Sequence, residues 1–209
     1  MLKLFRVIAV LLAALPVATG AAAAAQEKPA SSSKDRGRPS FEHVHALTVT
    51  ADGRTLLLGA HSGLFRSEDE GRSWQPVALP SKHPHVDVMA VTPHLEDARV
   101  IYVGTHEAGV FKTTDGGTSW QEANAGLGGA DVHGLAIDPR DPQKLHAAVR
   151  DKGEGIYRST DGGAKWVRVD DGPGGEVKVL SSVNIATGMG GIFLYAGTAE
   201  GLQRNPDCF

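Results

Sequence analysis

The sequence predicts an all-β fold built from four repeated units. Three nonapeptides, RSEDEGRSW, KTTDGGTSW and RSTDGGAKW, start at residues 66, 112 and 158, so both intervals are 46 residues long. The apolar runs between them are short and are bounded by Gly, Asp and Pro, which favours strands over helices. The last nine residues, GLQRNPDCF, continue the same spacing, with Asp207 lying 46 residues after Asp161. They indicate a truncated fourth unit.

Each unit contains the strand-like runs of one blade of a β-propeller. The first runs are VHALTV, VDVMAV, VHGLAI and VKVLSS, and further short apolar runs follow each of them. A unit of about 46 residues with four antiparallel strands has the size of a propeller blade. We therefore expect a four-unit β-propeller over residues 42–209, and the sequence leaves open whether the units close into a ring. A last unit without its outer strand would expose an edge through which two copies could pair as a homodimer.

The N-terminal residues have the composition of an export signal followed by a tether. Residues 1–25 combine Lys3 and Arg6 with an apolar run too short to span a bilayer and with small residues suited to cleavage. Residues 26–41 are rich in Ser, Pro, Lys and Arg, which predicts a flexible polar linker. No second long apolar stretch follows, so we expect a secreted or periplasmic protein whose mature form has no membrane span.

Charge and cysteine content exclude two further properties. The formal net charge is −3, and removal of the signal would take away two basic residues and no acid. A nucleic-acid partner is therefore not expected, because phosphate binding requires a basic face. Cys208 is the only cysteine, so the chain cannot form an intramolecular disulfide.

The three nonapeptides share the pattern S/T-x-D-x-G-x-x-W, which resembles the Asp-box, or BNR, repeat. That repeat occurs in sialidases, in sortilin-type receptors and in propellers related to photosystem II assembly factors. The resemblance implies that each box is a hairpin between the third and fourth strands of a blade, away from the ligand-binding face. We expect the Asp to accept backbone N–H groups, the Gly to adopt a positive φ and the Trp to cover the blade. The predicted box residues are Ser67, Asp69, Gly71, Trp74, Thr113, Asp115, Gly117, Trp120, Ser159, Asp161, Gly163 and Trp166, with Asp207 in the partial fourth copy.

The boxes are thus interpreted as scaffolding, and no catalytic residue is assigned. The first box has Glu70 where the others have Gly116 and Gly162, whereas the next position is Gly in all three. This difference predicts that the retained glycine is the one that needs a positive φ.

Polar residues recur where the blades are expected to meet a ligand. Alignment of the Val-x pairs in the first runs places His45, Asp87, His133 and Lys178 at one equivalent position. The second runs end at His61 and His106, with Arg150 at the third equivalent and Glu200 near the fourth. In an antiparallel blade the end of the second strand lies beside the start of the first, so both sets are expected at one channel mouth. The candidate ligand residues are His45, His61, Asp87, His106, Glu107, His133, Arg150 and Lys178.

Three functions fit this arrangement. The first is a non-catalytic binding or assembly module for a protein partner or a glycan, with no cofactor, in which the polar residues also cap blade interfaces. The second is a periplasmic transition-metal protein, because imidazoles with a carboxylate suit Zn, Cu or Ni, although Lys178 and Arg150 weigh against a cation. The third is an exo-sialidase-like glycoside hydrolase. The resemblance implies a tyrosine nucleophile and an arginine clamp for such an enzyme, but the tyrosines and most arginines here are explained by the repeat.

Overall fold

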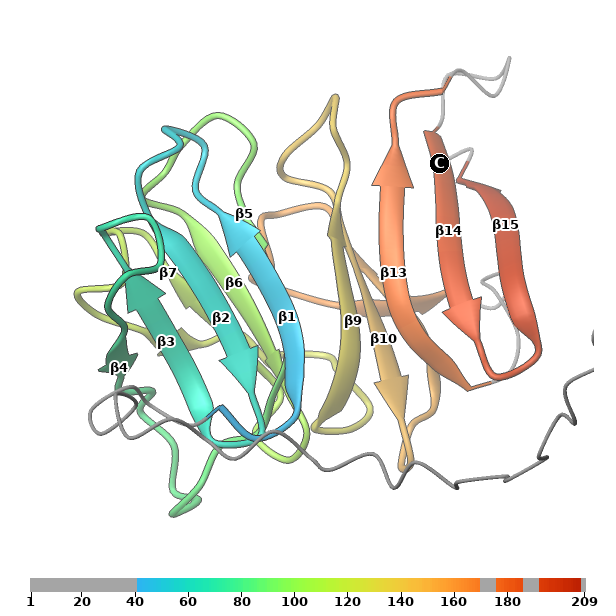
Figure 1. Ribbon diagram of the computed structural model, residues 1–209. Coiled ribbons are helices and arrows are strands. Elements are labelled where there is room, and N and C mark those ends of the chain that lie inside the picture. Colours follow the sequence, from blue (N-terminus) through green and yellow to red (C-terminus); the bar gives the residue numbers. More distant parts are fainter. Residues whose placement is uncertain (1–40, 170–175, 186–191, 208–209) are drawn as a thin grey trace, which may run out of the picture. The chain divides into compact units, whose positions relative to one another are not determined.

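In the computed structural model, residues 41–169, 176–185 and 192–207 are described, and they form four antiparallel sheets (Figure 1). The first sheet contains β1 (Val44–Val49), β2 (Leu56–Ala60), β3 (Gly63–Ser67) and β4 (Gln75–Val77). The second contains β5 (Val88–Pro93), β6 (Ile101–Thr105), β7 (Val110–Thr113) and β8 (Gln121–Glu122). The third contains β9 (Asp131–Ile137), β10 (Leu145–Arg150), β11 (Gly155–Ser159) and β12 (Val167–Val169).

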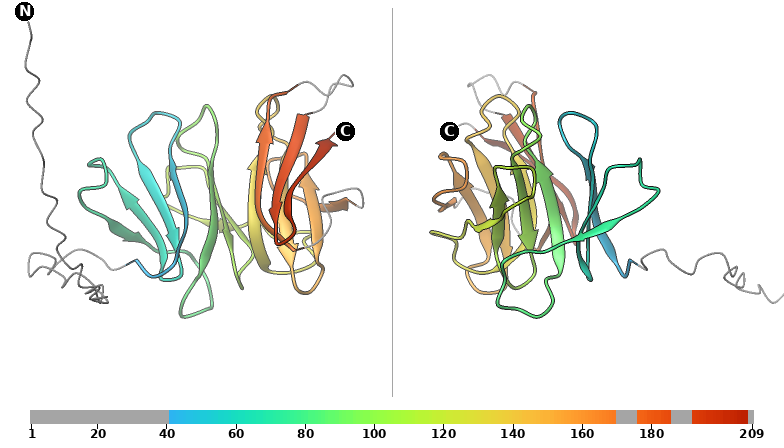
Figure 2. Two further views of the ribbon diagram at one scale, coloured as in Figure 1. Left: turned by 45° about the vertical axis from the view of Figure 1, so that its right-hand side comes forward. Right: turned by 90° about the vertical axis from the view of Figure 1, so that its left-hand side faces the viewer.

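The fourth sheet has three strands among the described residues, β13 (Val177–Val183), β14 (Ile192–Thr198) and β15 (Gly201–Asp207). Figure 2 shows it from a second side. In every sheet the strands are paired in chain order, and the first strands β1, β5, β9 and β13 contact one another in sequence. The predicted all-β, four-bladed propeller is therefore confirmed, including the short last blade.

The hydrophobic core lies between neighbouring sheets, because each inner sheet has apolar side chains on both faces. Between the first two sheets, Leu57 and Leu64 pack against Val88, Val103 and Phe111. Further clusters of the same kind lie between the second and third sheets and between the third and fourth. The stability of the fold thus depends on contacts between residues of neighbouring sheets, which are far apart in the sequence.

A glycine lets the first two sheets approach closely. A Cβ atom built on Gly59 of β2 would lie 2.6 Å from Cγ1 of Val88 and 3.0 Å from its carbonyl oxygen. Gly104 of β6 occupies the same register position and faces Val132 in the same way. In each case a valine side chain of the next sheet therefore fills the space that a residue larger than glycine would need.

Each Asp-box forms a hydrogen-bonded turn after the third strand of its sheet. In the first box, the Ser67 hydroxyl donates to Asp69 Oδ1 at 2.9 Å, and the N–H of Ser73 donates to the same oxygen at 2.8 Å. The N–H of Gly71 donates to Ser67 Oγ at 2.9 Å. The other two boxes repeat these three bonds.

These bonds stabilise the ionised carboxylates. The Ser73 hydroxyl and its backbone N–H lower the pKa of Asp69 to about 2, and Ser119 does the same to the pKa of Asp115, also to about 2. The pKa of Asp161 is also lowered, with the backbone N–H of Lys165 as the largest cause. A carboxylate that accepts several hydrogen bonds from its own turn has the properties of a structural group.

The retained glycine has a positive φ in all three boxes, as predicted, but the expectation that it is the one residue with a positive φ is wrong. Both residues after the Asp have positive φ in every box, at 60° and 81° for Glu70 and Gly71 and at 74° and 88° for Gly116 and Gly117. The turn needs two successive left-handed residues to direct its N–H groups inward, so the position of Glu70 also favours glycine. The first box therefore contains a strained non-glycine residue.

Parts of the predicted domain organisation lie outside the described residues. These are the export signal at 1–25, the linker up to residue 40 and Cys208. Asp207 ends β15, where it is paired with Ile192. A search of the described residues for a helix long and apolar enough to cross a membrane finds none.

Candidate functional site

The first strand of each sheet contains an irregularity near its start. The register shifts at His45 in β1, at Met89 in β5, at His133 in β9 and at Lys178 in β13. Such β-bulges place an extra residue on one strand and redirect its side chain. The equivalence predicted for Asp87 is therefore wrong, because Met89 occupies the bulge and Asp87 lies two residues earlier.

The reason for this error is visible in the sequence of the second unit. It contains two Val-x pairs in succession, Val86-Asp87 and Val88-Met89, and only the second is equivalent to Val44-His45. A pattern of residue types does not distinguish the two registers, which differ by one full strand period.

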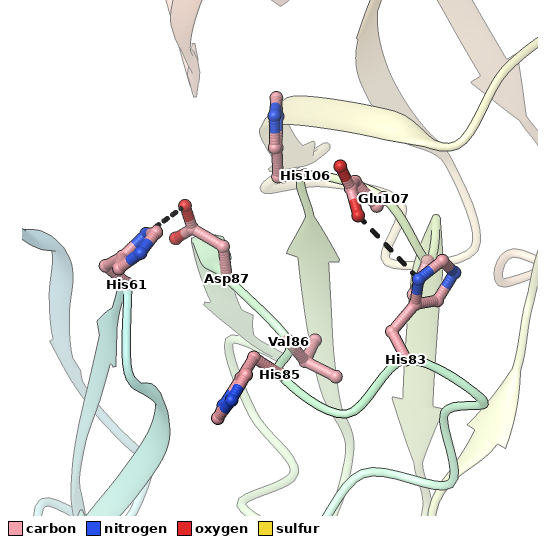
Figure 3. A pocket seen from close by; sticks show the side chains of 8 residues that line it. His61, His83, His85, Val86, Asp87, His106 and Glu107 are labelled. Carbon is pink, nitrogen blue, oxygen red and sulfur yellow. Dashed lines mark hydrogen bonds and ion pairs between the residues drawn. The ribbon is translucent and has the colours of Figure 1, made fainter.

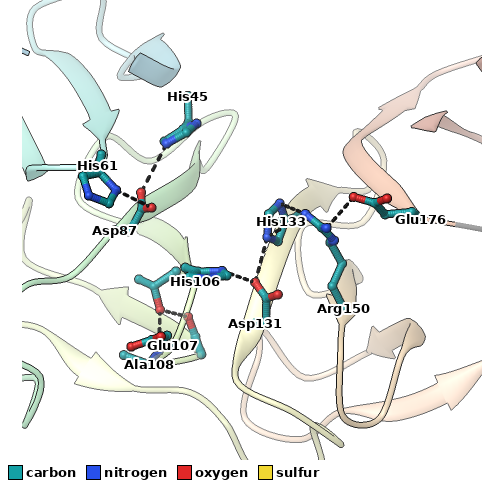
Figure 4. A network of polar contacts seen from close by, with 12 residues as sticks. His45, His61, Asp87, His106, Glu107, Ala108, Asp131, His133, Arg150 and Glu176 are labelled. Carbon is teal, nitrogen blue, oxygen red and sulfur yellow. Dashed lines mark hydrogen bonds and ion pairs between the residues drawn. The ribbon is translucent and has the colours of Figure 1, made fainter. Parts of the chain in front are cut away.

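The corrected register reveals a repeated contact between neighbouring sheets. His61 Nδ1 of the first sheet lies 2.9 Å from Asp87 Oδ2 of the second, and His106 Nδ1 of the second lies 2.9 Å from Asp131 Oδ1 of the third (Figure 4). Arg150 of the third sheet forms an ion pair with Glu176, which precedes β13. In each case a basic residue at the end of the second strand of one sheet, or directly after it, meets an acid at the start of the next sheet.

We call this edge of the four sheets the junction edge and define it by the three pairs His61–Asp87, His106–Asp131 and Arg150–Glu176. The Asp-boxes follow the third strands at the opposite edge. Sequence reasoning missed Asp131 and Glu176. They lie 44 and 45 residues after Asp87 and after Asp131, respectively, and this near-repeat of acids was the available sign.

Asp87 also interacts with a second imidazole. His45 Nε2 lies 3.2 Å from Asp87 Oδ1, so the carboxylate is placed between two histidines of the first sheet. The hydrogen bond and the charge of Asp87 raise the pKa of His61. The structure therefore brings together three of the predicted residues, His45, His61 and Asp87.

The contacts around Asp131 continue into a longer chain of polar groups. His133 Nε2 lies 2.8 Å from Asp131 Oδ1, and Arg150 Nη1 lies 3.0 Å from His133 Nδ1. The same Arg150 nitrogen lies 3.1 Å from His133 Nε2, so the guanidinium faces the ring edge between its two nitrogens. Burial lowers the pKa of His133, which agrees with a neutral ring.

A surface pocket of about 150 Å³ lies beside the first two pairs (Figure 3). His83 of the β4–β5 connection lies 3.7 Å from Glu107 in this pocket. The lining residues are His61, His83, His85, Val86, Asp87, His106, Glu107 and Ala108. The structure thus places the predicted Glu107 beside His61, Asp87 and His106.

Two residues considered for the site lie at the far end of the fold. Lys178 is exposed at the bulge of β13, and Glu200 is exposed in the turn between β14 and β15. The register places Ala199, and not Glu200, at the position equivalent to His61.

One group at this edge could hold a metal ion. His106, Asp131 and His133 each offer one ligand atom, and these atoms lie within 4.8 Å of one another. Two imidazoles and a carboxylate are a ligand set used by transition metals. The Arg150 guanidinium beside His133 opposes a cation at that position.

Comparison with known proteins places the fold in a wider context. The model of the family described as Sortilin, neurotensin receptor 3 (Sortilin-Vps10) matches residues 62–180. No curated protein matches the sequence.

Several solved structures share the fold. An ancestral GH74 enzyme superposes with a TM-score of 0.59 at 18% identity, over 79% of this chain and 23% of that chain. The structure "YCF48 bound to D1 peptide" gives 0.55 at 18% identity, over 78% of this chain and 50% of that chain. The extracellular domain of a hybrid two component system from B. thetaiotaomicron gives 0.59 at 16% identity, over 80% and 24%.

This chain spans half or less of the length of each of these proteins. At such identities the likeness shows a shared propeller fold. The family match covers more than half of the sequence and includes all three complete Asp-boxes, Ser67–Trp74, Thr113–Trp120 and Ser159–Trp166. The chain therefore belongs to the Sortilin-Vps10 family of propellers.

Proposed function

We propose that this chain is an exported binding module that recognises a segment of a partner protein through the junction edge. The observation that carries the proposal is the row of basic–acidic pairs, one at each of the three sheet junctions, along a single edge. Here the imidazoles of His61 and His106 are 59% and 48% exposed.

The carboxylates orient these imidazoles toward a ligand. His61 and His106 each use Nδ1 to contact an Asp, which leaves Nε2 available on the exposed side of the ring. When the Nδ1–H group donates a hydrogen bond to the carboxylate, a neutral ring offers Nε2 as an acceptor, and a protonated ring offers it as a donor. Peptide N–H groups and the donors of Lys, Arg, Ser or Asn side chains would satisfy that acceptor.

The pocket between the first two pairs adds depth to this edge. Its walls combine imidazoles and carboxylates with the apolar Val86 and Ala108, so it suits one side chain of a bound peptide. The YCF48 neighbour was solved with a D1 peptide, which is consistent with peptide recognition by a propeller of this type.

The proposal is tested with synthetic peptides. Random dodecapeptides displayed on phage are selected on the immobilised full chain, and the affinities of the selected peptides are measured by fluorescence polarisation. We expect His61→Ala and His106→Ala each to weaken binding about tenfold, as for the loss of one hydrogen bond near a charged group. Arg72→Ala is the control, because Arg72 is exposed at the box edge.

Two results would contradict the proposal. One is a selection that yields no peptide that binds the chain. The other is an equal loss of affinity in the Arg72→Ala control and the two histidine variants, which would place the binding surface elsewhere.

A second candidate function is transition-metal binding by His106, Asp131 and His133. It is favoured by the proximity of their ligand atoms, which lie within 4.8 Å of one another. Titration calorimetry with Zn²⁺, Cu²⁺ or Ni²⁺ tests it. Binding of one metal ion per chain, with a heat that disappears in His133→Ala, would support it. Arg150→Ala should strengthen metal binding, because it removes the positive charge beside the site. The absence of heat with all three ions excludes this candidate.

A further inference from the structure

We call the face of the first sheet that is turned away from the second sheet its front face. On this face Leu58, Ala60 and Phe65 are buried and cluster with Phe41 and Trp74, whereas the first strand is exposed although its equivalents in the other sheets are buried. On β1, Leu47 is 64% exposed. The residues at the same register position of the other sheets are Val91, Leu135 and Leu180, with exposures of 9, 5 and 5%. Each of those three packs against the preceding sheet. The first sheet therefore presents a blade interface that no preceding sheet among the described residues covers.

The back face of the fourth sheet shows the complementary exposure. On β15, Leu202 is 75% exposed. Its equivalents on the third strands of the other sheets are Leu64, Val110 and Ile156, with exposures of 2, 0 and 2%. Those residues pack against the following sheet. Val179, at 56% exposure, lies on the same face of the fourth sheet.

The two exposed faces contain the residues that pack neighbouring blades together within the chain, a glycine on one sheet and a valine on the next. At the first junction Val88 packs against Gly59, and at the second Val132 packs against Gly104. Gly197 of β14 occupies the glycine position on the back of the fourth sheet, and Val44 of β1 occupies the valine position on the front of the first. Val44 is exposed, and a Cβ on Gly197 would meet only its own neighbour, Val179.

The charges at these two faces are also compatible. At the three internal junctions an acid at the start of a sheet meets a basic residue of the preceding sheet. The first sheet has His43 at the acid position, and the fourth has Ala199 followed by Glu200 at the basic position. Ala199 carries no charge and its neighbour Glu200 is acidic, so no basic residue of the fourth sheet would oppose His43 at this position.

We propose that a second copy of this chain covers these faces, with the fourth sheet of each copy packed against the first sheet of the other. A head-to-tail contact of this kind produces a closed ring or an open filament, depending on the angle it repeats. Two copies supply eight blades from their four sheets each, which is within the range of roughly four to eight blades typical of propellers. Three copies would exceed it. The expected assembly is therefore a two-fold symmetric pair that completes one propeller.

This contact differs from pairing through the outer edge of the last blade. Edge pairing would use the backbone of β15, whereas the proposed contact buries the faces of the first and fourth sheets. The contact is also independent of any ligand at the junction edge, so the proposed binding function can fail while the assembly holds.

Sedimentation equilibrium of the full chain tests the inference, with reducing agent present so that the single cysteine cannot link two chains. We expect a reversible dimer in the parent. Leu47→Glu and Leu202→Glu should each raise the dissociation constant of the dimer about 100-fold. A dimer of either variant has the substitution at both contacts, and loss of one buried leucine raises the dissociation constant about tenfold. Val167→Glu is the matched control, since Val167 is 58% exposed on the outer strand β12. It should leave the dimer unchanged.

Mixing the two variants separates this arrangement from others. In a dimer of one Leu47→Glu copy and one Leu202→Glu copy, both substitutions lie at the same contact. The other contact has the parent residues on both faces. The mixture should therefore dimerise more strongly than either variant alone. Circular dichroism confirms that the variants fold, as expected for substitutions at exposed positions.

Several results would overturn the inference. They are a parent that stays monomeric at every concentration, and a Val167→Glu variant as weak as the others. Dissociation by Leu47→Glu with no effect of Leu202→Glu would show that identical faces pair, and a series of growing oligomers would show that the contact does not close.

Discussion

Replacement of Gly59 by Ala tests whether the glycine sets the distance between the first two sheets. The added Cβ would lie 2.6 Å from Val88 Cγ1, which is about 1 Å less than an ordinary contact of roughly 3.5–4.0 Å between carbon atoms. Val88 is fully buried and its β-branched side chain has little rotamer freedom. The two sheets must therefore separate to accommodate the methyl group.

The expected cost follows from two opposing effects. Overpacking of a close-packed interior costs about 1–3 kcal/mol, and the higher strand preference of Ala over Gly returns about 0.5–1 kcal/mol. We expect Gly59→Ala to lower the free energy of unfolding by about 1–2 kcal/mol. For a domain of about 170 residues this corresponds to a fall in Tm of about 2–8 °C.

A double-mutant cycle isolates the contact. The free energy of unfolding is measured by urea denaturation of the parent, Gly59→Ala, Val88→Ala and the double variant. Val88→Ala alone creates a small cavity, and in the double variant the methyl group added at position 59 would occupy part of it. The two single losses should therefore sum to about 1 kcal/mol more than the loss in the double variant. Additive losses, or a Gly59→Ala variant as stable as the parent, would refute the view that close approach requires this glycine.

Three further predictions concern the boxes and the junction edge. Glu70→Gly should raise the free energy of unfolding by about 0.5 kcal/mol, because relief of a left-handed residue (about 1–2 kcal/mol) exceeds the backbone entropy of the added glycine, and a fall in Tm would contradict this. Asp115→Asn should weaken the loss of stability between pH 4 and pH 2, since the pKa of Asp115 is about 2 in the fold and the stabilisation of its ionised form disappears as pH falls through that value. Asp87→Asn should bring the pKa of His61 back toward 6.5 in an NMR titration, because Asp87 is the cause of its upward shift, and an unchanged pKa would exclude that pair in solution.

The fold was predictable because the residues that define the box interact within a few positions of one another. Ser67 contacts Asp69 two residues later, and Ser73 contacts Asp69 across four. A local motif of this kind repeats at a constant interval and reveals the blades without knowledge of their packing. The positive φ of Glu70 was missed because a residue type alone does not report the strain that its turn imposes.

The junction edge was only partly predictable. His61 and His106 directly follow second strands and Arg150 is the last residue of β10, which are the positions that the repeat predicted. Their acids were harder to place, because His61 and Asp87 are 26 residues apart and meet only when two sheets pack. The bulge at Met89 also shifts the register by one residue, and the pattern of apolar residues does not show where such an extra residue lies.

The separation of the boxes from the junction edge has an evolutionary consequence. The boxes keep a fixed interval, whereas the acids at the other edge are spaced by 44 and 45 residues, so the spacing there differs between units. Insertions and substitutions at that edge leave the scaffold turns intact. Natural variation or laboratory selection can therefore change the residues of one junction at a time, while each blade keeps the hydrogen-bonded turn that its own box forms.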